Sequence, residues 1–504
     1  MKFGRREFIE KMLLFTGSAS LVGCATESNS PQPVKLNTTH SPLPTPEEPS
    51  NPLLKGLNLD HFRLHNPKPL ALESIRAGIG MGALTATNRL FIRNNLPSPD
   101  QSIIDNASEW RIQIQGVKES KTFSIQDLKQ FAYENLCAVL QCSGNGRKFF
   151  EHGPSGSQWA TGAAGCVIWG GTKLSDVIKS CGGALDGMNY ITATGGEELP
   201  EDVPRDKAIV ERSIPLEKGL KDCLIAWEMN GEPIPLSHGG PVRFVVPGYF
   251  GCNQIKYVNA IAATVEESTA KIQSSGYRLR NIGEKGNNKQ PSMWRMPVKS
   301  WIVDAQPLFD NRYRIQGVAF SGERGVSKIE TSLDGENWQD AEFYGPDLGV
   351  HAWRVFQATV AISDGQSIVY TRAIDTQGDV QPKNRIENER GYGNNSWLDH
   401  GFNVRKNGVV NKKDTVISNI NEETAEAGKQ VYQESVPSCG TCHTLEDAGS
   451  VGQVGPNLNQ LQPDATRVER AVTNGVGAMP AFGETLTPEQ IKDLAAYVAD
   501  AAHK

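Results

Sequence analysis

The chain of 504 residues is too long for a single hydrophobic core, so its length predicts two to four domains. Hydrophobic residues make up 38% and charged residues 21% of the sequence, which is typical of globular proteins. The net charge of −6 argues against nucleic acid as a partner. No apolar run reaches the roughly 18 residues that a membrane-spanning helix needs.

The first 23 residues are predicted to be an export signal. The segment Gly4-Arg5-Arg6-Glu7-Phe8-Ile9 has the twin-arginine pattern, and a short apolar stretch follows it. The stretch ends in Leu21-Val22-Gly23-Cys24, which resembles a bacterial lipobox, so Cys24 is predicted to be lipidated. We therefore expect export by the twin-arginine route to the periplasm and a lipid anchor in the membrane. The alternative is an ordinary amphipathic N-terminal helix.

Two domains are expected between this signal and residue 404. Residues 24–55 are predicted to be an extended linker, because seven prolines lie among polar residues that have little to bury. Residues 56–290 mix strand patterns, such as 110–117, with helix starts, such as 124–128. Residues 291–404 contain several short strands separated by turns, which suggests an immunoglobulin-like β-sandwich.

The C-terminal part is predicted to be a linker followed by a helical domain. Residues 405–422 are polar and rich in Asn and Lys, whereas residues 423–504 have a helical pattern. Thr487-Pro488-Glu489-Gln490 is a capping box with proline at the first helical position, and it predicts the start of a terminal helix.

Cys439-Gly440-Thr441-Cys442-His443 is the strongest single motif in the chain. Both thiols of Cys439 and Cys442 can form thioethers with haem, while His443 ligates the iron. A zinc site is disfavoured, because only His503 and no further cysteine follows. The segment 423–504 resembles an all-α class I cytochrome c.

This resemblance implies two further features of the haem site. Met479 is the expected second iron ligand, a pair of ligands that suits electron transfer. In Gly455-Pro456-Asn457-Leu458 the carbonyl of Pro456 is expected to accept a hydrogen bond from His443 and to orient it.

A second cysteine loop lies in the central region. An apolar run leads into Gln141-Cys142-Ser143-Gly144-Asn145-Gly146-Arg147. The glycines allow close approach to a bulky ligand, and Asn145 and Arg147 bring donors suited to an anion. Cys142 is therefore a candidate metal ligand. From these residues alone, a small buried core cysteine is an equally good interpretation.

The cysteine loop and several later segments resemble the sulfite oxidase family of molybdopterin enzymes over residues 56–404. The matching segments are Phe91-Ile92-Arg93-Asn94-Asn95-Leu96-Pro97, Leu140–Arg147, Trp159 with Gly162-Ala163-Ala164-Gly165, Glu228–Pro233, His238–Arg243, Val246-Pro247-Gly248, and Met296-Pro297-Val298. The implied fold is an α+β molybdopterin domain followed by the β-sandwich, through which members of the family often dimerise.

The resemblance also implies the site residues. The catalytic pocket is expected to comprise Arg93, Cys142, Trp159, Tyr277 and Arg390, with Cys142 ligating molybdenum. The pterin and its phosphate are expected to contact Phe91, Arg93, Asn95, Cys142, Arg147, His238, Arg243, Gln254, Ile255 and Lys256. The family often has histidine in place of Asn95. An acidic pterin contact of some relatives has no clear match, and Asp202 is the candidate.

The implied activity is oxidation of sulfite to sulfate at a molybdenum-molybdopterin centre, with electrons passing through haem c to an external cytochrome c or copper protein. Two arginines suit a small dianion. Related nitrate reductases lack the second arginine, so Arg390 favours sulfite. The alternatives are a sulfane-sulfur dehydrogenase of thiosulfate oxidation and an electron-transfer lipoprotein with a non-catalytic pterin domain.

Overall fold

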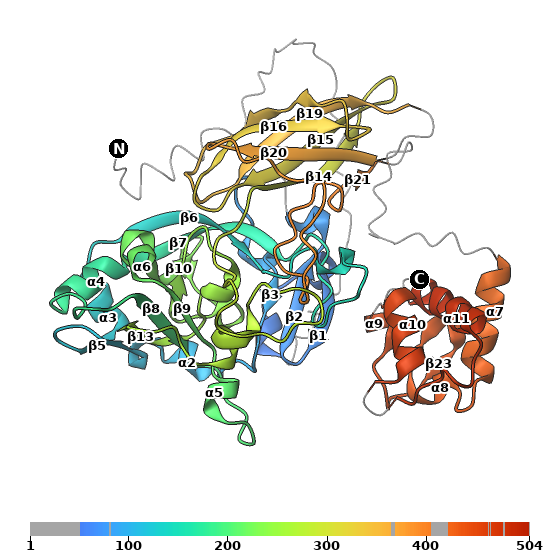
Figure 1. The fold of residues 1–504 in the computed structure, drawn as a ribbon, viewed down its shortest axis with the longest axis horizontal. Coiled ribbons are helices and arrows are strands. Elements are labelled where there is room, and N and C mark those ends of the chain that lie inside the picture. Colours follow the sequence, from blue (N-terminus) through green and yellow to red (C-terminus); the bar gives the residue numbers. More distant parts are fainter. Residues whose placement is uncertain are drawn as a thin grey trace, which may run out of the picture. The chain divides into compact units, whose positions relative to one another are not determined.

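The computed structural model describes residues 51–504, except 80–81, 364–367, 405–421, 462, 464, 477–478 and 503–504 (Figure 1). The expected signal, Cys24, nearly all of the Pro-rich linker and all but the last residue of the 405–422 linker lie outside the described residues. Within the described part of the chain, no helix has both the length and the apolar character that crossing a membrane requires.

The N-terminal α+β domain contains three sheets. The first sheet has the order β1 (Phe62–Pro67), β2 (Leu70–Ser74), β3 (Ile92–Arg93). The second has the order β11 (Glu232–Pro233), β10 (Leu224–Met229), β7 (Ala164–Lys173), β6 (Glu134–Gln141), and β12 (Arg243–Val245) also pairs with β10. The third has the order β5 (Lys121–Ser124), β4 (Arg111–Gln115), β13 (Val258–Thr264), β8 (Tyr190–Gly195), β9 (Glu211–Pro215).

Short helices lie between the strands of this domain in the sequence. They are α2 (Ser102–Asp105), α3 (Ile125–Leu128), α4 (Leu174–Ser180), α5 (Arg205–Ala208) and α6 (Leu216–Asp222). The helix start predicted at 124–128 is confirmed, because Ser124 and Asp127 form a capping box at the beginning of α3. The strand predicted at 110–117 is β4, in which Ile112 and Ile114 are fully buried while the residues between them face outward.

The next domain is a sandwich of two four-stranded sheets, as predicted (Figure 1). One sheet has the order β14 (Lys299–Pro307), β15 (Arg312–Phe320), β19 (Arg354–Ala361), β18 (Glu342–Tyr344). The other has the order β17 (Gln339–Asp340), β16 (Val326–Ser332), β20 (Ile368–Asp375), β21 (Phe402–Asn403). All pairs are antiparallel, and their inward side chains, among them Ile315, Ile329 and Phe356, form one core.

The segment between β20 and β21 contacts the cysteine loop of the α+β domain. Gly393 donates its backbone N–H to the carbonyl of Ser143 at 2.8 Å. Asn394 donates its side-chain amide to the carbonyl of Gly146 at 3.0 Å. Sandwich-domain residues thus help to fix the loop that carries Cys142.

The C-terminal domain is helical, as predicted. Its elements include α7 (Glu422–Glu434), α8 (Cys439–Cys442), α9 (Leu458–Leu461), α10 (Ala465–Asn474) and α11 (Pro488–Ala501), with a small hairpin of β22 (Thr444–Leu445) and β23 (Ser450–Val451). The capping box predicted at Thr487 is present at the start of α11. Tyr432 of α7 and Leu494 and Tyr497 of α11 lie in the buried core.

Candidate active site and haem site

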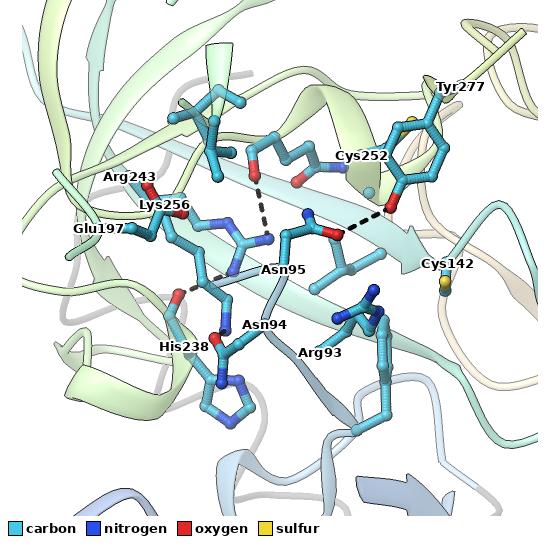
Figure 2. A pocket seen from close by; sticks show the side chains of 16 residues that line it. Arg93, Asn94, Asn95, Cys142, Glu197, His238, Arg243, Cys252, Lys256 and Tyr277 are labelled. Carbon is cyan, nitrogen blue, oxygen red and sulfur yellow. Dashed lines mark hydrogen bonds between the residues drawn. The ribbon is translucent and has the colours of Figure 1, made fainter. Parts of the chain in front are cut away.

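A cavity in the α+β domain brings together most of the predicted site (Figure 2). The predicted residues that line it are Phe91, Arg93, Asn95, Cys142, His238, Arg243, Gln254, Ile255, Lys256 and Tyr277. Asn94, Glu197 and Cys252 also line it and were not predicted from the sequence.

Three nitrogen-bearing side chains gather at one end of this cavity (Figure 2). Lys256 Nζ donates to Asn94 Oδ1 at 2.8 Å and to the carbonyl of Ser237 at 2.6 Å. Arg243 Nη1 donates to the carbonyl of His238 at 2.7 Å, and Arg243 is only 3% exposed. His238 is 1% exposed. We call Lys256, Arg243 and His238 the cation cluster.

Burial and mutual repulsion set the charge of the cation cluster. Burial, followed by the charges of Lys256 and Arg243, lowers the pKa of His238 to about 3, so its ring is neutral at pH 7. Burial also lowers the pKa of Arg243 to about 10. Burial, with the charge of Arg243 next, lowers the pKa of Lys256 well below its ordinary value.

One acidic residue, Glu197, lines the same end of the cavity. Burial raises its pKa to about 7, even though the charges of Lys256 and Arg243 oppose that shift. Asp202, the acidic candidate from the sequence, is exposed and is not among the residues that line the cavity. The structure does not bring Asp202 to the cavity, and a role for it stays a prediction. The signal for Glu197 was weak, because it consists only of one carboxylate after the glycine pair that ends β8.

The cation cluster fits a phosphate group. Among the described residues, Arg243 Nε is buried without a hydrogen-bond partner, so this donor is left for a ligand, whereas the unpartnered oxygens Gln254 Oε1 and, when ionised, Glu197 Oε2 can only accept. A phosphate would bring the negative charge that the three nitrogen-bearing side chains lack, and it would raise their pKa values again. The donor set therefore agrees with the predicted pterin phosphate site.

Cys142 and Tyr277 lie away from the cation cluster, at the other end of the cavity in Figure 2. Tyr277 donates its hydroxyl to Asn95 Oδ1 at 3.2 Å. Burial raises the pKa of Tyr277, so the hydroxyl stays protonated at neutral pH. Arg93 also lines the cavity, and its charge acts on both Tyr277 and Lys256. A thiol, a guanidinium and a phenol donor thus face one space.

Other side chains of the protein lie close to the glycines of the cysteine loop. A Cβ on Gly144 would lie 2.5 Å from Nη2 of Arg147, and one on Gly146 would lie 3.0 Å from Asn394. Gly146 also has φ +92°, which favours glycine. The positive φ expected of this loop is present at Gly146, whereas the approach of a bulky ligand to these glycines stays a prediction.

Three predicted residues are not among the described residues that line the cavity: Arg147, Trp159 and Arg390. Arg147 donates to the backbone carbonyls of Arg390 and Ser157, both at 2.9 Å. Trp159 is fully buried and lies edge-on to Phe91, with ring centroids 6.4 Å apart. The side-chain amide of Asn145 is likewise hydrogen-bonded within the protein, since it donates to Gln141 at 3.1 Å and accepts from the N–H of Ala163 at 3.1 Å. The roles predicted for these side chains stay predictions.

The helical domain contains a second, largely apolar cavity. Cys439, Cys442, His443 and Met479 all line it, as the haem motif requires. Apolar side chains such as Leu458, Phe482 and Leu494 complete the wall. Two thiols, an imidazole and a thioether around an apolar space fit a covalently bound haem with two axial ligands.

The orientation of His443 supports this assignment. His443 Nδ1 lies 2.9 Å from the carbonyl of Pro456, which is the predicted bond. This contact assigns the proton to Nδ1 and leaves Nε2 free to ligate iron. Gly455 is required beside it, because a Cβ at this position would lie 2.4 Å from Cε1 of His443.

Protein-family models match three consecutive parts of the chain. Residues 96–272 match the oxidoreductase molybdopterin binding domain, and residues 290–405 match the Mo-co oxidoreductase dimerisation domain. Residues 423–498 match the model described as cytochrome C oxidase, cbb3-type, subunit III. These ranges agree with the three domains seen in the structure.

Similar proteins include a sulfite oxidase of Arabidopsis thaliana, 29% identical over 387 residues, which cover 70% of this chain and 94% of the relative. The mitochondrial sulfite oxidase of Mus musculus is 29% identical over 360 residues, which cover 67% of this chain and 64% of the mouse protein. This chain therefore spans somewhat less than two thirds of the mouse protein.

Among solved structures, the sulfane dehydrogenase SoxCD of Paracoccus pantotrophus matches with a TM-score of 0.56 and 24% identity. The match covers 68% of this chain and 88% of that chain, and it shows a shared fold. The three family models and the similarity to the sulfite oxidases place the chain in the sulfite oxidase family of molybdopterin enzymes, with a dimerisation domain and a C-terminal cytochrome c domain.

Proposed function

We propose that the protein is a sulfite dehydrogenase that oxidises sulfite to sulfate and passes the electrons through its haem c to an external cytochrome c or copper protein. One observation carries the proposal. A single chain combines a cavity that holds Cys142, Arg93 and Tyr277 opposite a buried cation cluster with a second cavity lined by a haem-attachment motif.

The side chains of the first cavity have different proposed roles. Cys142 would ligate a molybdenum ion, and the cation cluster would hold the phosphate of its pterin. The bound molybdenum centre supplies oxygen-atom transfer and accepts two electrons. Arg93 attracts the sulfite anion into the cavity, where partial exclusion of water strengthens their attraction. The protonated hydroxyl of Tyr277, which donates to Asn95 in this structure, is free to donate to a substrate oxygen instead.

Arg390 is proposed as a second anion-binding residue. Its Nε is buried and, among the described residues, has no hydrogen-bond partner. Its guanidinium carbon lies 5.9 Å from the centre of the Tyr392 ring, and the ring of Tyr392 stacks on that of Tyr277 at 5.3 Å. These contacts link Arg390 to a cavity residue, which supports a role close to the substrate.

Location and assembly complete the proposal. The twin-arginine pattern and the lipobox around Cys24 support export and attachment to a membrane by a lipid anchor. The match of residues 290–405 to a dimerisation domain supports a homodimer, which light scattering would detect as twice the mass of one chain.

The decisive experiment is Cys142→Ser in the purified, molybdenum-loaded protein. We expect sulfite-dependent haem reduction to fall by at least about a thousandfold, because the thiolate ligand is lost while the haem domain is untouched. The absorbance spectrum of the haem should not change. Cys137→Ser is the matched control, since Cys137 lies on β6, the strand that leads to the loop, and is not among the residues lining the cavity.

The same assay separates the alternatives. Full turnover of Cys142→Ser would exclude Cys142 as the ligand. A wild-type protein whose haem is reduced only by carrier-bound sulfane sulfur would be a sulfane dehydrogenase. Metal analysis that finds haem but no molybdenum would identify an electron-transfer protein with a non-catalytic pterin domain.

A further inference from the structure

The loop that carries Cys142 is held by a second stretch of backbone, residues 157–163, which we call the bracket segment. The carbonyl of Ala163 accepts the N–H of Cys142 at 2.9 Å, and the N–H of Ala163 donates to Asn145 Oδ1 at 3.1 Å. The carbonyl of Trp159 accepts the N–H of Lys148 at 3.1 Å. The bracket segment is therefore bonded to the cysteine loop at both of its ends.

The opposite side of the bracket segment rests on one buried carboxylate, that of Glu73 in β2. Glu73 Oε1 accepts the backbone N–H of Ala160 at 2.7 Å and that of Gly162 at 2.9 Å. The contact with β2 is close, because a Cβ on Gly162 would lie 1.7 Å from the carbonyl oxygen of Ser74. Glu73 is 3% exposed, so water does not replace its bonds readily.

His65 completes the environment of this carboxylate. Its Nε2 lies 2.7 Å from Glu73 Oε2, and its ring lies 4.6 Å from that of Trp159, centroid to centroid. Burial alone raises the pKa of Glu73, but the hydrogen bond and charge of His65, the charge of Arg63 and the N–H of Gly162 outweigh it and lower the pKa. The carboxylate is therefore ionised, and ionised acceptors form the stronger hydrogen bonds.

We propose that Glu73 is a positioning residue for the metal-binding loop, which it holds in place through the bracket segment. Glu73 is not among the residues that line the cavity, and its carboxylate oxygens are bonded to the bracket segment and to His65. The inference rests on the proposed function in one respect, because the loop matters for turnover only if Cys142 ligates the metal.

Loss of the carboxylate has a specific physical consequence. The N–H groups of Ala160 and Gly162 would be left buried without their acceptor, which favours opening of the bracket segment. Because this segment supplies an acceptor to Cys142 and a donor to Asn145, the cysteine loop would open with it. A displacement of about 1 Å at a catalytic ligand can cost about a hundredfold in rate.

The test compares three variants of the holoenzyme by hydrogen–deuterium exchange and by turnover with sulfite. Glu73→Ala removes the acceptor. Glu73→Gln keeps a carbonyl oxygen for the two N–H groups and is the rescue. Ser74→Ala is the matched control, because Ser74 is buried on the same strand but donates its hydroxyl to the carbonyl of Arg89 at 2.6 Å.

We expect Glu73→Ala to speed exchange about tenfold or more in two peptides, 142–150 and 157–163. Its kcat for sulfite should fall about tenfold or more, with KM changed by less than about threefold, since Arg93 is untouched. Glu73→Gln should restore both exchange and kcat to within about threefold of wild type. Ser74→Ala should differ from wild type by less than about threefold in each measurement.

Exchange that rises only in peptide 157–163 would overturn the proposal, since Glu73 would then hold its own neighbours and not the cysteine loop. Equal effects of Glu73→Ala and Ser74→Ala would also overturn it.

If Glu73→Ala does not fold, Gly162→Ala provides a second route, because it forces the bracket segment from β2 while the carboxylate remains. It should speed exchange in both peptides, and no change in peptide 142–150 would count against the proposal. Faster exchange in both peptides together with full turnover of Cys142→Ser would support the positioning role and reject the proposed function.

Discussion

At the scale of single residues, the three side chains of the cation cluster share one property: their surroundings disfavour the charged form before any ligand is present. His238, Arg243 and Lys256 all have lowered pKa values for this reason. Burial without a counter-ion is unfavourable for the protein alone and becomes favourable when a phosphate enters. Cofactor binding is therefore expected to take up protons at the cluster and to stabilise the fold.

Glu197 allows this electrostatic arrangement to be tested through pH. Its folded pKa of about 7 lies above the ordinary value of 4.5, so the folded state holds the proton more tightly than the unfolded state. The contribution of Glu197 is fully present below about pH 4.5 and is lost as the pH rises towards 7. Glu197→Gln removes this loss. In the molybdenum-free protein its Tm, relative to wild type, should rise by at least about 2 °C between pH 5 and pH 8.

Glu198→Gln is the control for this experiment, because Glu198 is the next residue and is exposed. Its Tm relative to wild type should be the same at both pH values. If the difference in Tm between Glu197→Gln and wild type is the same at both pH values, the carboxyl of Glu197 does not titrate between these limits.

Sequence reasoning located most residues of the site, and what it did not find has two separate causes. Cys142, His238, Arg243 and Lys256 were found because their order and spacing follow a family pattern, and the structure brings them into one cavity. The closeness of Arg147 to Gly144 was not predicted, because glycine signals that space is needed but not what fills it. Glu197 was missed because a single carboxylate has no periodic signal.

Local patterns determine several elements directly. The capping boxes at Ser124 and Thr487 appear at the predicted residues, since each depends on contacts only three residues apart. The alternation in β4 likewise places Ile112 and Ile114 inside. In contrast, the bonds from Gly393 and Asn394 to the cysteine loop join residues about 250 positions apart, so no local pattern predicts them.

The cap of α11 provides a prediction at the scale of an element. Thr487 Oγ1 accepts the N–H of Gln490 at 3.2 Å, and Gln490 Oε1 accepts that of Thr487 at 2.9 Å. Thr487→Ala removes the first bond, so the cytochrome domain should lose about 1 kcal/mol of unfolding free energy. Denaturant unfolding followed by haem absorbance measures the loss.

Thr473→Ala is the comparison for the cap. The hydroxyl of Thr473 donates to the carbonyl of Glu469 within α10, where the backbone is already hydrogen-bonded. Its removal should change the unfolding free energy by less than about 0.5 kcal/mol. Equal losses in the two variants would mean that Thr487 contributes through helix propensity and not as a cap.

At the scale of the whole molecule, the sequence predicted three folded domains because each has its own pattern of hydrophobic residues and motifs. Alternation of short strands identified the sandwich, and the haem motif with its terminal helix identified the cytochrome domain. The family models match the same three parts at residues 96–272, 290–405 and 423–498. These sequence patterns could not show that the chain returns from the sandwich to the cysteine loop before it reaches the cytochrome domain.

The combination of two redox sites on one chain makes a stoichiometric prediction. Oxidation of one sulfite releases two electrons, whereas one haem accepts one. The predicted ligation by His443 and Met479 is expected to give a high reduction potential, so the haem should collect electrons first. Without an external acceptor, and once electrons have equilibrated between chains so that the second electron of each sulfite reaches the haem of another chain, about half an equivalent of sulfite per chain should therefore reduce the haem fully, as followed by its absorbance. The variant Met479→His lowers the haem potential and should require more sulfite to reach the same reduction. A sharp end point at a full equivalent in the wild type would show that the haem receives only one electron from each sulfite, and an oxidised haem after excess sulfite would remove it from the path altogether.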